Sequence, residues 1–387
     1  MFAPSLIRRL LVERQYLERR RESSAAALVQ HLEAVQVDPV NLIARNQELA
    51  LFSRLSTYRA GQADYYHGSA RLFEYIAGNR ALLPLDDLPL FVPFMRRREA
   101  RHQETLRSLQ ASVRQVLREL ERQGPLTSRR IVCAEKTHGY WENAHAAPRT
   151  KETSHALQLL WEAGRVTVVG RAGGESVFDL AERAFPADLL RRGEEMSLAE
   201  ARRLLREKYY RAFGIFDAQH AGFAWQRLTA RERAEAIAAD EARGVIERLP
   251  VAGVRRSYWA PAGTGEALAA SAQTELKKEA RFLPPLDNLL WRRERLEDLF
   301  GFNYRWEIYT PARKRTGGPY TMPILYGSDL VGRLNARFER KTKQLLVEGI
   351  TYEPGIRGEK SLTRAVAEEL DRLREFLGAA RVNQGPS

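Results

Sequence analysis

The chain contains a single cysteine, Cys133, among its 387 residues. One thiol cannot form an intramolecular disulfide, and it excludes every zinc site that needs two or more thiolates. The sequence also lacks a run of about 18 apolar residues, the length of a membrane-spanning helix. Arg8 and Arg9 interrupt the first apolar residues too early for a secretory signal. We therefore expect a soluble, cytoplasmic protein with no membrane partner.

Several sequence motifs of common enzymes are missing as well. The chain has no glycine-rich phosphate loop and no Gly-x-Ser-x-Gly elbow, so nucleotide hydrolysis and serine hydrolysis have no support. The seven histidines are scattered, and none is paired with another at the i, i+4 spacing of a helical metal site. His138 and His145 lie seven residues apart in one loop, where a polar role is a better interpretation than a metal. We expect neither a metal nor a cofactor.

Charge is the property that stands out in the composition. Lysine and arginine number 62 against 49 acidic residues, which gives a net charge of +13. Such a surface attracts polyanions, because phosphate neutralisation releases counterions. Nucleic acid is the first partner to consider, although a basic surface on an ordinary enzyme is the alternative. A chain of this length with 44% hydrophobic residues is expected to form two to four modules.

The N-terminal part has helical spacing in residues 5–21, 25–34 and 42–58. Between the last two lies Val35-Gln36-Val37-Asp38-Pro39, in which valines alternate with polar residues. This alternation predicts a short strand or extended turn, and the proline keeps Asp38 out of helical geometry. Gln36 and Asp38 are then expected to project from the same face. Taken alone, such a pair usually marks the wet face of a strand.

Residues 126–180 follow the pattern of a winged helix. A long helix over 95–123 is expected to link it to the N-terminal part, and helices are predicted at 128–135 and 151–163. Gly164 then precedes two strands, 166–169 and 176–178, joined by a glycine-rich turn.

The pattern recurs further along, with capping boxes at Ser197 and Thr229 and a candidate hairpin at 245–248 and 257–259. Beyond Arg281 the character changes to β. Strands are predicted at 304–309, 321–325, 333–339 and 345–352, with a helix at 361–377 covering a small barrel or sandwich.

Candidate DNA contacts follow from these elements. A winged helix inserts its second helix into the major groove, and its wing touches phosphates. Its role can also be that of a scaffold or a protein docking site. The glycine-rich loop after Tyr309 can track a DNA backbone or be a solvated basic turn. The residues concerned are Arg149, Lys151 and His155 at the helix start, Arg171 at the expected wing tip, and Arg313, Lys314 and Arg315 in the loop.

Several ordered blocks together resemble the AlkZ/YcaQ (AlkX-like) winged-helix DNA glycosylases, also known as helix-turn-helix family 42. The resemblance spans roughly residues 4 to 355. The blocks are VQVDPV at 35–40, ARNQELALFSR at 44–54, RFLPPLDNLLW at 281–291 and EIYTPARKR at 307–315. Tyr320-Thr321-Met322-Pro323 departs modestly from the tyrosine-rich run of the family.

The resemblance implies an α+β protein with three tandem winged-helix units in a C-shaped array around duplex DNA, followed by a C-terminal β-barrel. The expected modules are 1–94, 95–190, 191–275 and 276–387. The family's catalytic motif, Gln-apolar-Gln or Gln-apolar-Asp, is Gln36-Val37-Asp38 here. Its Asp form resembles the YcaQ-type branch, which is associated with alkylated purines and nitrogen-mustard-type cross-links. Arg45 and Asn46 are candidates for backbone contacts near the lesion, or for a structural role between helices.

These implications predict a monofunctional, monomeric, nucleoid-associated DNA repair enzyme that acts on double-stranded DNA with alkylated or cross-linked bases. Asp38 is expected to orient or deprotonate the attacking water and to stabilise the oxocarbenium-like sugar, while Gln36 positions that water. The competing hypothesis is a non-catalytic winged-helix transcriptional regulator. A structural or docking protein is a third, and it is distinguished by a lack of salt-dependent duplex binding.

Overall fold

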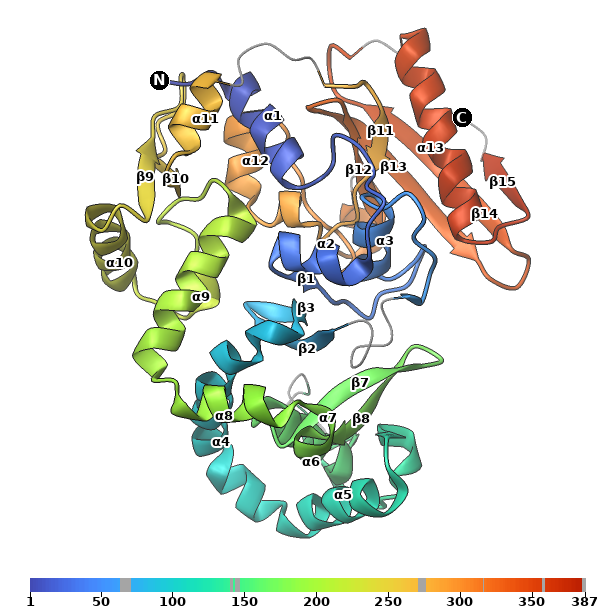
Figure 1. Ribbon diagram of the computed structural model, residues 1–387. Coiled ribbons are helices and arrows are strands. Elements are labelled where there is room, and N and C mark those ends of the chain that lie inside the picture. Colours follow the sequence, from blue (N-terminus) through green and yellow to red (C-terminus); the bar gives the residue numbers. More distant parts are fainter. Residues whose placement is uncertain are drawn as a thin grey trace. The chain divides into compact units, whose positions relative to one another are not determined.

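A computed structural model describes residues 1–62, 71–139, 142, 147–270, 276–315, 317–356 and 359–384 (Figure 1). His145, one of the two loop histidines discussed above, lies outside this range. The chain groups into two compact units. The first comprises Met1–Gln62, Ala77–Ala81 and Arg206–Ser387, and the second comprises Ala63–Ile76 and Leu82–Leu205. The four expected modules are finer subdivisions, and their boundaries stay a prediction.

The first unit begins with α1 (Pro4–Arg14), α2 (Ala25–Leu32), β1 (Val35–Gln36) and α3 (Asn46–Phe52). The Ser24 hydroxyl caps α2 by accepting a hydrogen bond from the Ala27 amide at 3.1 Å. The helices predicted over 5–21 and 42–58 are present as α1 and α3, and both are shorter than predicted. The first ends early because the backbone at Tyr16 turns to a φ of +53°.

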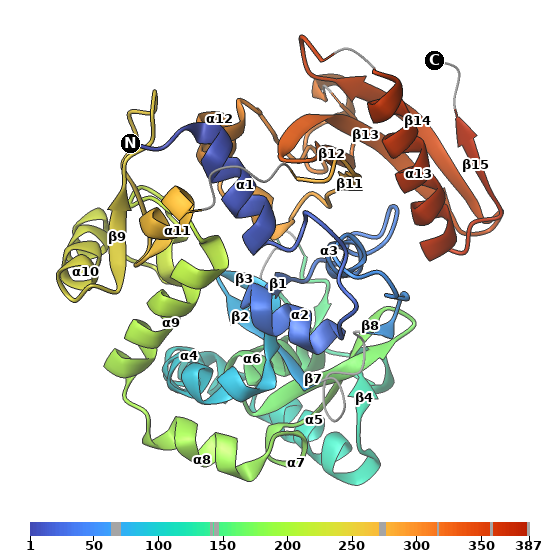
Figure 2. The same cartoon turned by 45° about the horizontal axis from the view of Figure 1, so that its top comes forward.

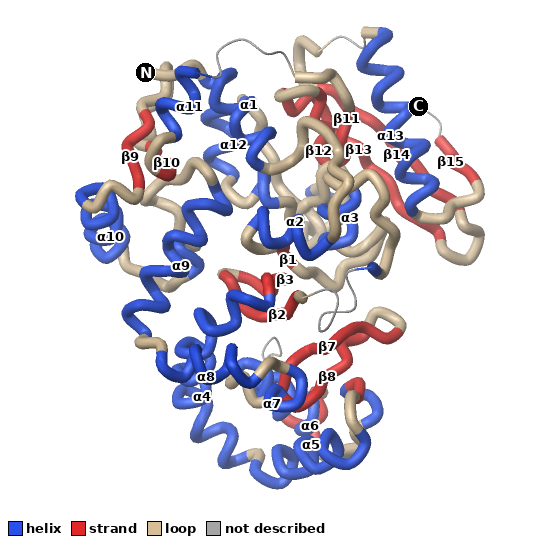
Figure 3. Tube along the Cα trace, viewed as in Figure 1, coloured by secondary structure: helices blue, strands red, loops and turns tan. Residues whose placement is uncertain are grey.

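A hairpin of β2 (Leu72–Ala77) and β3 (Asn79–Pro84) joins β1 in a sheet of order β1-β3-β2. The aromatic run that leads to Leu83-Pro84 predicts the end of a helical N-terminal module, and this prediction is wrong for residues 72–84, which form strands (Figure 3). The chain turns at Gly78, whose φ is +72°. A side chain here would place its Cβ 2.8 Å from Trp225 Cδ1. The turn therefore favours glycine both for its positive φ and for the space that Trp225 occupies.

The middle of the chain supplies α9 (Leu198–Phe213), α10 (Ala230–Ala242), β9 (Ile246–Leu249), β10 (Tyr258–Pro261) and α11 (Thr264–Ala270). Both predicted capping interactions are present. The Thr229 hydroxyl and the Glu232 carboxylate complete a capping box on α10, and the Ser197 hydroxyl accepts from the Glu200 amide at 3.1 Å. The hairpin of β9 and β10 is confirmed as well.

The C-terminal part is a curled five-stranded sheet of order β11-β12-β13-β14-β15 with α13 (Lys360–Phe376) packed along it (Figure 2). Its strands are β11 (Ala280–Phe282), β12 (Thr321–Tyr326), β13 (Asp329–Glu339), β14 (Gln344–Tyr352) and β15 (Arg381–Gln384). Three of the four predicted strands and the helix are confirmed, but a closed barrel is not.

The strand predicted at residues 304–309 is wrong, since these residues lie in a loop after α12 (Arg293–Phe300). Tyr304 is held by its side chain rather than by a strand ladder, because its hydroxyl donates to the Thr321 carbonyl at 2.7 Å. Aromatic alternation marked a cavity wall here and not a sheet.

A buried ion pair connects the N-terminal and C-terminal segments of the first unit. The Arg54 guanidinium donates to both Asp287 carboxylate oxygens, at 2.7 and 2.9 Å, and neither side chain is exposed. Arg54 also donates to the Gln15 carbonyl at 2.7 Å, and Asp287 accepts from the Leu289 amide at 3.0 Å. Both charges are thus compensated, as burial demands.

The second unit contains α4 (Leu88–Ser108), α5 (Gln110–Gln123), α6 (Glu152–Glu162), α7 (Ala181–Ala184) and α8 (Ala187–Glu195). A sheet of order β4-β8-β7 accompanies them, built from β4 (Leu126–Thr127), β7 (Val166–Ala172) and β8 (Glu175–Leu180), and a small β5–β6 pair (Lys136–Thr137, Thr150–Lys151) precedes α6.

Helix α6 and the β7–β8 hairpin confirm the predicted elements around Gly164, whereas two other predictions fail. The expected 95–123 helix is split at Leu109, where ψ is +21°. Residues 128–135 form only a 3-10 turn, Ser128–Arg130. The winged-helix assignment stays a prediction.

Candidate active site

The Gln36-Val37-Asp38 segment leaves the end of β1 with the alternation that the sequence predicts. The Val37 amide donates to the Arg80 carbonyl at 2.8 Å, which ties the segment to β3. The Val37 side chain is buried, while Gln36 and Asp38 are half-exposed. The two polar side chains are therefore available to a substrate, and the valine between them anchors the backbone.

Asp38 is held in a defined conformation. Its carboxylate accepts a hydrogen bond from the Val40 amide at 2.8 Å, which is the contact that defines an Asx turn. Burial raises the pKa of Asp38 above its ordinary value of 3.8, and the Val40 amide opposes this shift. A raised pKa makes the carboxylate a stronger base than a solvated aspartate.

Tyr320 is the aromatic neighbour of Asp38. It is fully buried, and burial together with the negative charge of Asp38 raises the pKa of its hydroxyl. That hydroxyl has no hydrogen-bond partner in the part of the chain that the structure describes. Its ring contacts Trp306 edge-on, with centroids 6.3 Å apart. Asp38 thus borders an aromatic region rather than a second carboxylate.

Asn46 fixes the position of Gln36. Its amide nitrogen donates to the Gln36 carbonyl at 2.8 Å, and its oxygen accepts from the Leu286 amide at 3.1 Å. Asn46 is almost completely buried. The structure therefore gives it the structural role that was the alternative to a DNA contact. The Gln36 side-chain oxygen accepts a long hydrogen bond, 3.5 Å, from the Asn79 side-chain nitrogen.

A cavity of about 390 Å³ opens beside Gln36. Residues from β1, the β2–β3 turn, the end of α9 and the 285–309 region line it. Trp225 and Trp291 meet edge-on at a centroid distance of 6.1 Å, and the Trp291 indole donates to the Leu286 carbonyl at 3.0 Å. The aromatic lining consists of Phe213, Trp225, Trp291, Tyr304, Trp306 and Tyr309.

His220 is a polar group of the cavity wall that the sequence did not single out. Its Nδ1 lies 2.8 Å from the hydroxyl of the fully buried Tyr209. Burial, and then the positive charge of Arg292, lower the pKa of His220 to about 4. The imidazole is therefore neutral at physiological pH. No spacing rule connects His220 with residue 36, which explains why sequence reasoning missed it.

The family model of AlkZ-like DNA glycosylases matches residues 29–376, which include this entire site. The chain belongs to this family. Among solved structures, the DNA glycosylase AlkZ of Streptomyces sahachiroi is similar, with a TM-score of 0.62 over 99% of this chain and 100% of that chain. The two share 17% sequence identity, so this likeness concerns the fold.

The AlkZ-like family implies a DNA substrate, and the structure places the other predicted contact residues as follows. Arg313 and Lys314 lie in an exposed 3-10 turn, Ala312–Lys314. Arg315 folds back, because its guanidinium donates to the Thr310 carbonyl at 2.8 Å. Arg45 precedes α3 with a mostly buried side chain 3.6 Å from the Glu48 carboxylate. The loop after Tyr309 therefore has two exposed cations, Arg313 and Lys314.

Four further predicted contacts belong to the second unit. Arg149 is exposed, and Lys151 and His155 are half-buried at the start of α6. Burial lowers the pKa of His155. Arg171 was expected at the wing tip, but it lies within β7, before the Gly173-Gly174 turn, and forms an ion pair with the buried Glu74.

Two features are absent from the residues that the structure describes. No helix among them is long and apolar enough to cross a bilayer. They also contain no group of three or more His, Cys, Asp or Glu side chains arranged to hold a metal ion.

Proposed function

We propose that this DNA glycosylase hydrolyses the N-glycosidic bond of N7- or N3-alkylated purines in duplex DNA. The observation that carries the proposal is the placement of Gln36 and Asp38. They flank a buried valine at the end of β1, with Gln36 in the wall of an aromatic cavity and Asp38 at Tyr320. Family membership supplies the reaction class.

The leaving group needs little acid catalysis from the protein. Alkylation makes the purine cationic, so the bond to C1′ is already weakened. Asp38 accepts a proton from water as the water oxygen bonds to C1′, and the electron pair of the broken bond leaves with the base. The carboxylate also stabilises the positive charge that develops on the sugar, while Gln36 orients the water. Because water is the nucleophile, the enzyme is monofunctional.

The proposal extends to cross-links that join two purines at N7. Each half of such a lesion is an alkylated purine, so the same hydrolysis unhooks it from one strand. The exposed cations Arg313 and Lys314 are proposed to contact the DNA backbone beside the lesion. Arg149 and Lys151 have the corresponding role in the second unit.

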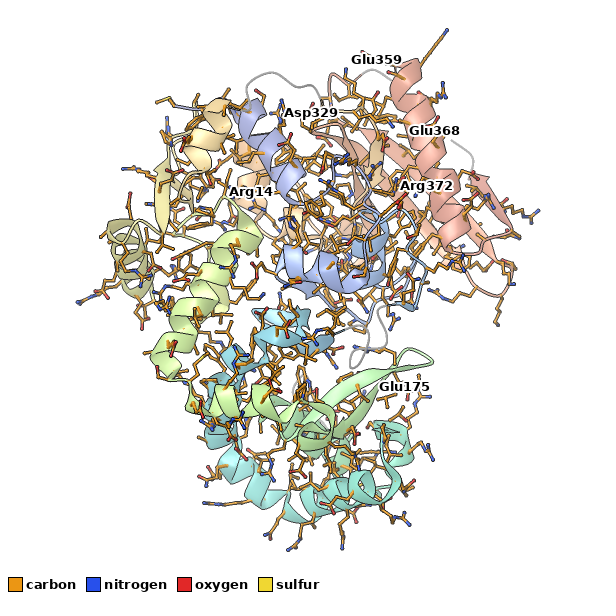
Figure 4. The ribbon with its side chains drawn as sticks, in the orientation of Figure 1. Arg14, Glu175, Asp329, Glu359, Glu368 and Arg372 are labelled. Carbon is orange, nitrogen blue, oxygen red and sulfur yellow. The ribbon has the colours of Figure 1, made fainter. Side chains whose placement is uncertain are left out.

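The test is base release from two duplexes, one with N7-methylguanine and one with a nitrogen-mustard cross-link. We expect wild-type protein to act on both. Asp38→Asn should lower single-turnover release by about 10²–10⁴-fold, the usual contribution of a general base, with duplex binding retained. The matched control is Asp329→Asn, an acid-to-amide change at an exposed residue that is labelled in Figure 4.

Gln36→Ala should reduce release by a smaller factor, about 10–100-fold, because it positions water without accepting the proton. Wild-type protein that binds duplex DNA tightly but releases no base from either substrate would refute the enzymatic proposal. It would favour a winged-helix regulator instead.

A further inference from the structure

We propose that the aromatic cavity beside Gln36 binds the alkylated purine to be excised, and that His220 is a neutral hydrogen-bond donor to that base. The inference rests on the proposed function and specifies its substrate pocket. It assigns a recognition role to residues outside the Gln36-Val37-Asp38 motif.

The cavity has the size and lining that a planar base requires. Its volume of about 390 Å³ lies within the roughly 300–1,000 Å³ range of small-molecule sites. Trp225, Trp291 and Trp306 supply indole rings, and a cationic alkylpurine is attracted to such rings both by stacking and by their quadrupole. The Trp306 indole N–H is buried and finds no acceptor among the described residues.

The backbone of the wall is held in an unusual conformation. Ala224 and Trp225 are consecutive non-glycine residues with positive φ, +56° and +52°. Strain of this kind persists where the surroundings impose it, and it concentrates at binding sites. Here it places Trp225 over Gly78, the residue whose missing side chain makes room for the indole.

The hydrogen-bond partner of His220 fixes its tautomer. The Tyr209 hydroxyl is fully buried, and His220 Nδ1 is its hydrogen-bond partner at 2.8 Å. If Nδ1 carried the hydrogen, the hydroxyl hydrogen would be left buried without an acceptor, which is unfavourable. The hydroxyl therefore donates to Nδ1, and the hydrogen resides on Nε2. Since His220 lines the cavity, Nε2–H is its available donor.

The surroundings keep this donor uncharged. Burial is the largest cause of the lowered pKa of His220. Arg292 and Arg295 lower it further, against the opposing effect of Asp217 and Glu294. Arg292 is locked in a two-pronged ion pair with Asp217 at 2.8 and 3.0 Å, and Arg295 donates to the Phe213 and Ile215 carbonyls. Arg292 and Arg295 lie behind the wall, and the cavity lining itself includes the exposed Arg293. A neutral imidazole can approach a cationic base without repulsion.

A neutral Nε2–H has a specific chemical use. An N7-alkylated guanine presents O6 and N3 as acceptors, and electron density at both increases as the glycosidic bond breaks. A fixed donor therefore binds the departing base more strongly in the transition state than in the intact nucleotide. No proton is transferred, so His220 acts by hydrogen bonding alone.

The first measurement is quenching of tryptophan fluorescence by free 7-methylguanine. Wild-type protein should bind it, and His220→Phe should weaken binding and single-turnover release from N7-methylguanine DNA by about 10–100-fold, the range for one lost hydrogen bond to a buried group. His220→Gln retains a neutral donor and should recover part of the loss. His138→Phe, in the second unit, is the control.

Two further readouts separate recognition from structure. Tyr209→Phe keeps the ring but frees the tautomer, so it should weaken binding less than His220→Phe does. The contribution of His220, expressed as the ratio of wild-type to His220→Phe release, should stay constant between pH 5.5 and 8, because the imidazole remains neutral there. Thermal unfolding of each variant checks that it is folded.

The outcomes distinguish this inference from the proposed function. Normal base release with His220→Phe matching the control overturns the pocket and leaves the proposed function intact. His220→Gln no better than His220→Phe in both assays overturns the donor role. Absence of base release by wild-type protein overturns the proposed function, and the inference with it.

Discussion

At the scale of single residues, Asp38 combines a chemical advantage with a cost in stability. Burial raises its pKa in the folded protein, so folding favours the protonated form. Its contribution to stability is therefore fully present below the unfolded pKa and is lost as the pH rises through the folded pKa. At neutral pH the ionised, partly buried carboxylate destabilises the fold, whereas the proposed role of Asp38 as a general base requires that ionised form.

Because of this conflict, one substitution should lower activity without lowering stability. Asp38→Asn should lower base release by about 10²–10⁴-fold yet unfold at a temperature equal to or above that of wild-type protein at pH 7. The difference should shrink as the pH falls through the raised pKa of Asp38 in the folded protein, where wild-type Asp38 gains its proton. The acid limb of wild-type base release should lie above pH 3.8. Thermal scans and pH–rate profiles measure both, and a less stable variant at pH 7 would contradict the burial argument.

Residue-level prediction from sequence succeeded where the signal was local. Alternation and Pro39 predicted a short strand or extended turn, and the structure has β1 at Val35–Gln36 with Val37 buried between half-exposed Gln36 and Asp38. That the two side chains project from the same face stays a prediction. Their catalytic role came from the family resemblance and stays a proposal. His220 and Trp225 carried no such signal, because they meet Gln36 only through the tertiary fold. Asn46 was ambiguous in sequence, and burial decided in favour of a structural role.

At the scale of secondary-structure elements, the errors share a physical cause. Periodicity reports which side chains are apolar, and it does not report which backbone partners are within reach. Residues 304–309 alternate like a strand but line a cavity, and β2 and β3 pair in a stretch that was expected to complete a helical module. Capping signals were more reliable, as at Thr229, because they depend on neighbours three residues away.

The β2–β3 turn offers a matched test of cavity shape. Gly78→Ala imposes a positive φ on a residue with a side chain and also forces its Cβ against Trp225. Gly253 has nearly the same φ, +75° against +72°, but open space around it. Both variants should lose about 1–2 kcal/mol of unfolding free energy from the backbone. Only Gly78→Ala should also lower 7-methylguanine binding, and equal binding by both variants would contradict a role for the turn in the cavity.

At the scale of the whole molecule, the Arg54–Asp287 pair connects parts of the first unit that are 233 residues apart in sequence. Arg54→Met leaves a buried carboxylate without its partner and should cost about 3–5 kcal/mol of unfolding free energy. Arg374→Met, at an exposed pair with Asp371, should cost at most about 1 kcal/mol. Denaturant unfolding measures both. The double variant Arg54→Met/Asp287→Leu should lose less than the sum of its single variants, and strict additivity would argue against coupling.

The same pair sets an order of events during synthesis. The first unit contains residues from both ends of the chain, and most of the second unit is inserted between them. At about 5–20 residues per second, roughly 10 to 50 s pass between translation of Arg54 and translation of Asp287. Residues 82–205 are completed in that interval, while the strand that carries Gln36 still lacks the tryptophans of its cavity. The nascent chain therefore exposes the Gln36-Val37-Asp38 segment until Trp291 and Trp306 have been translated.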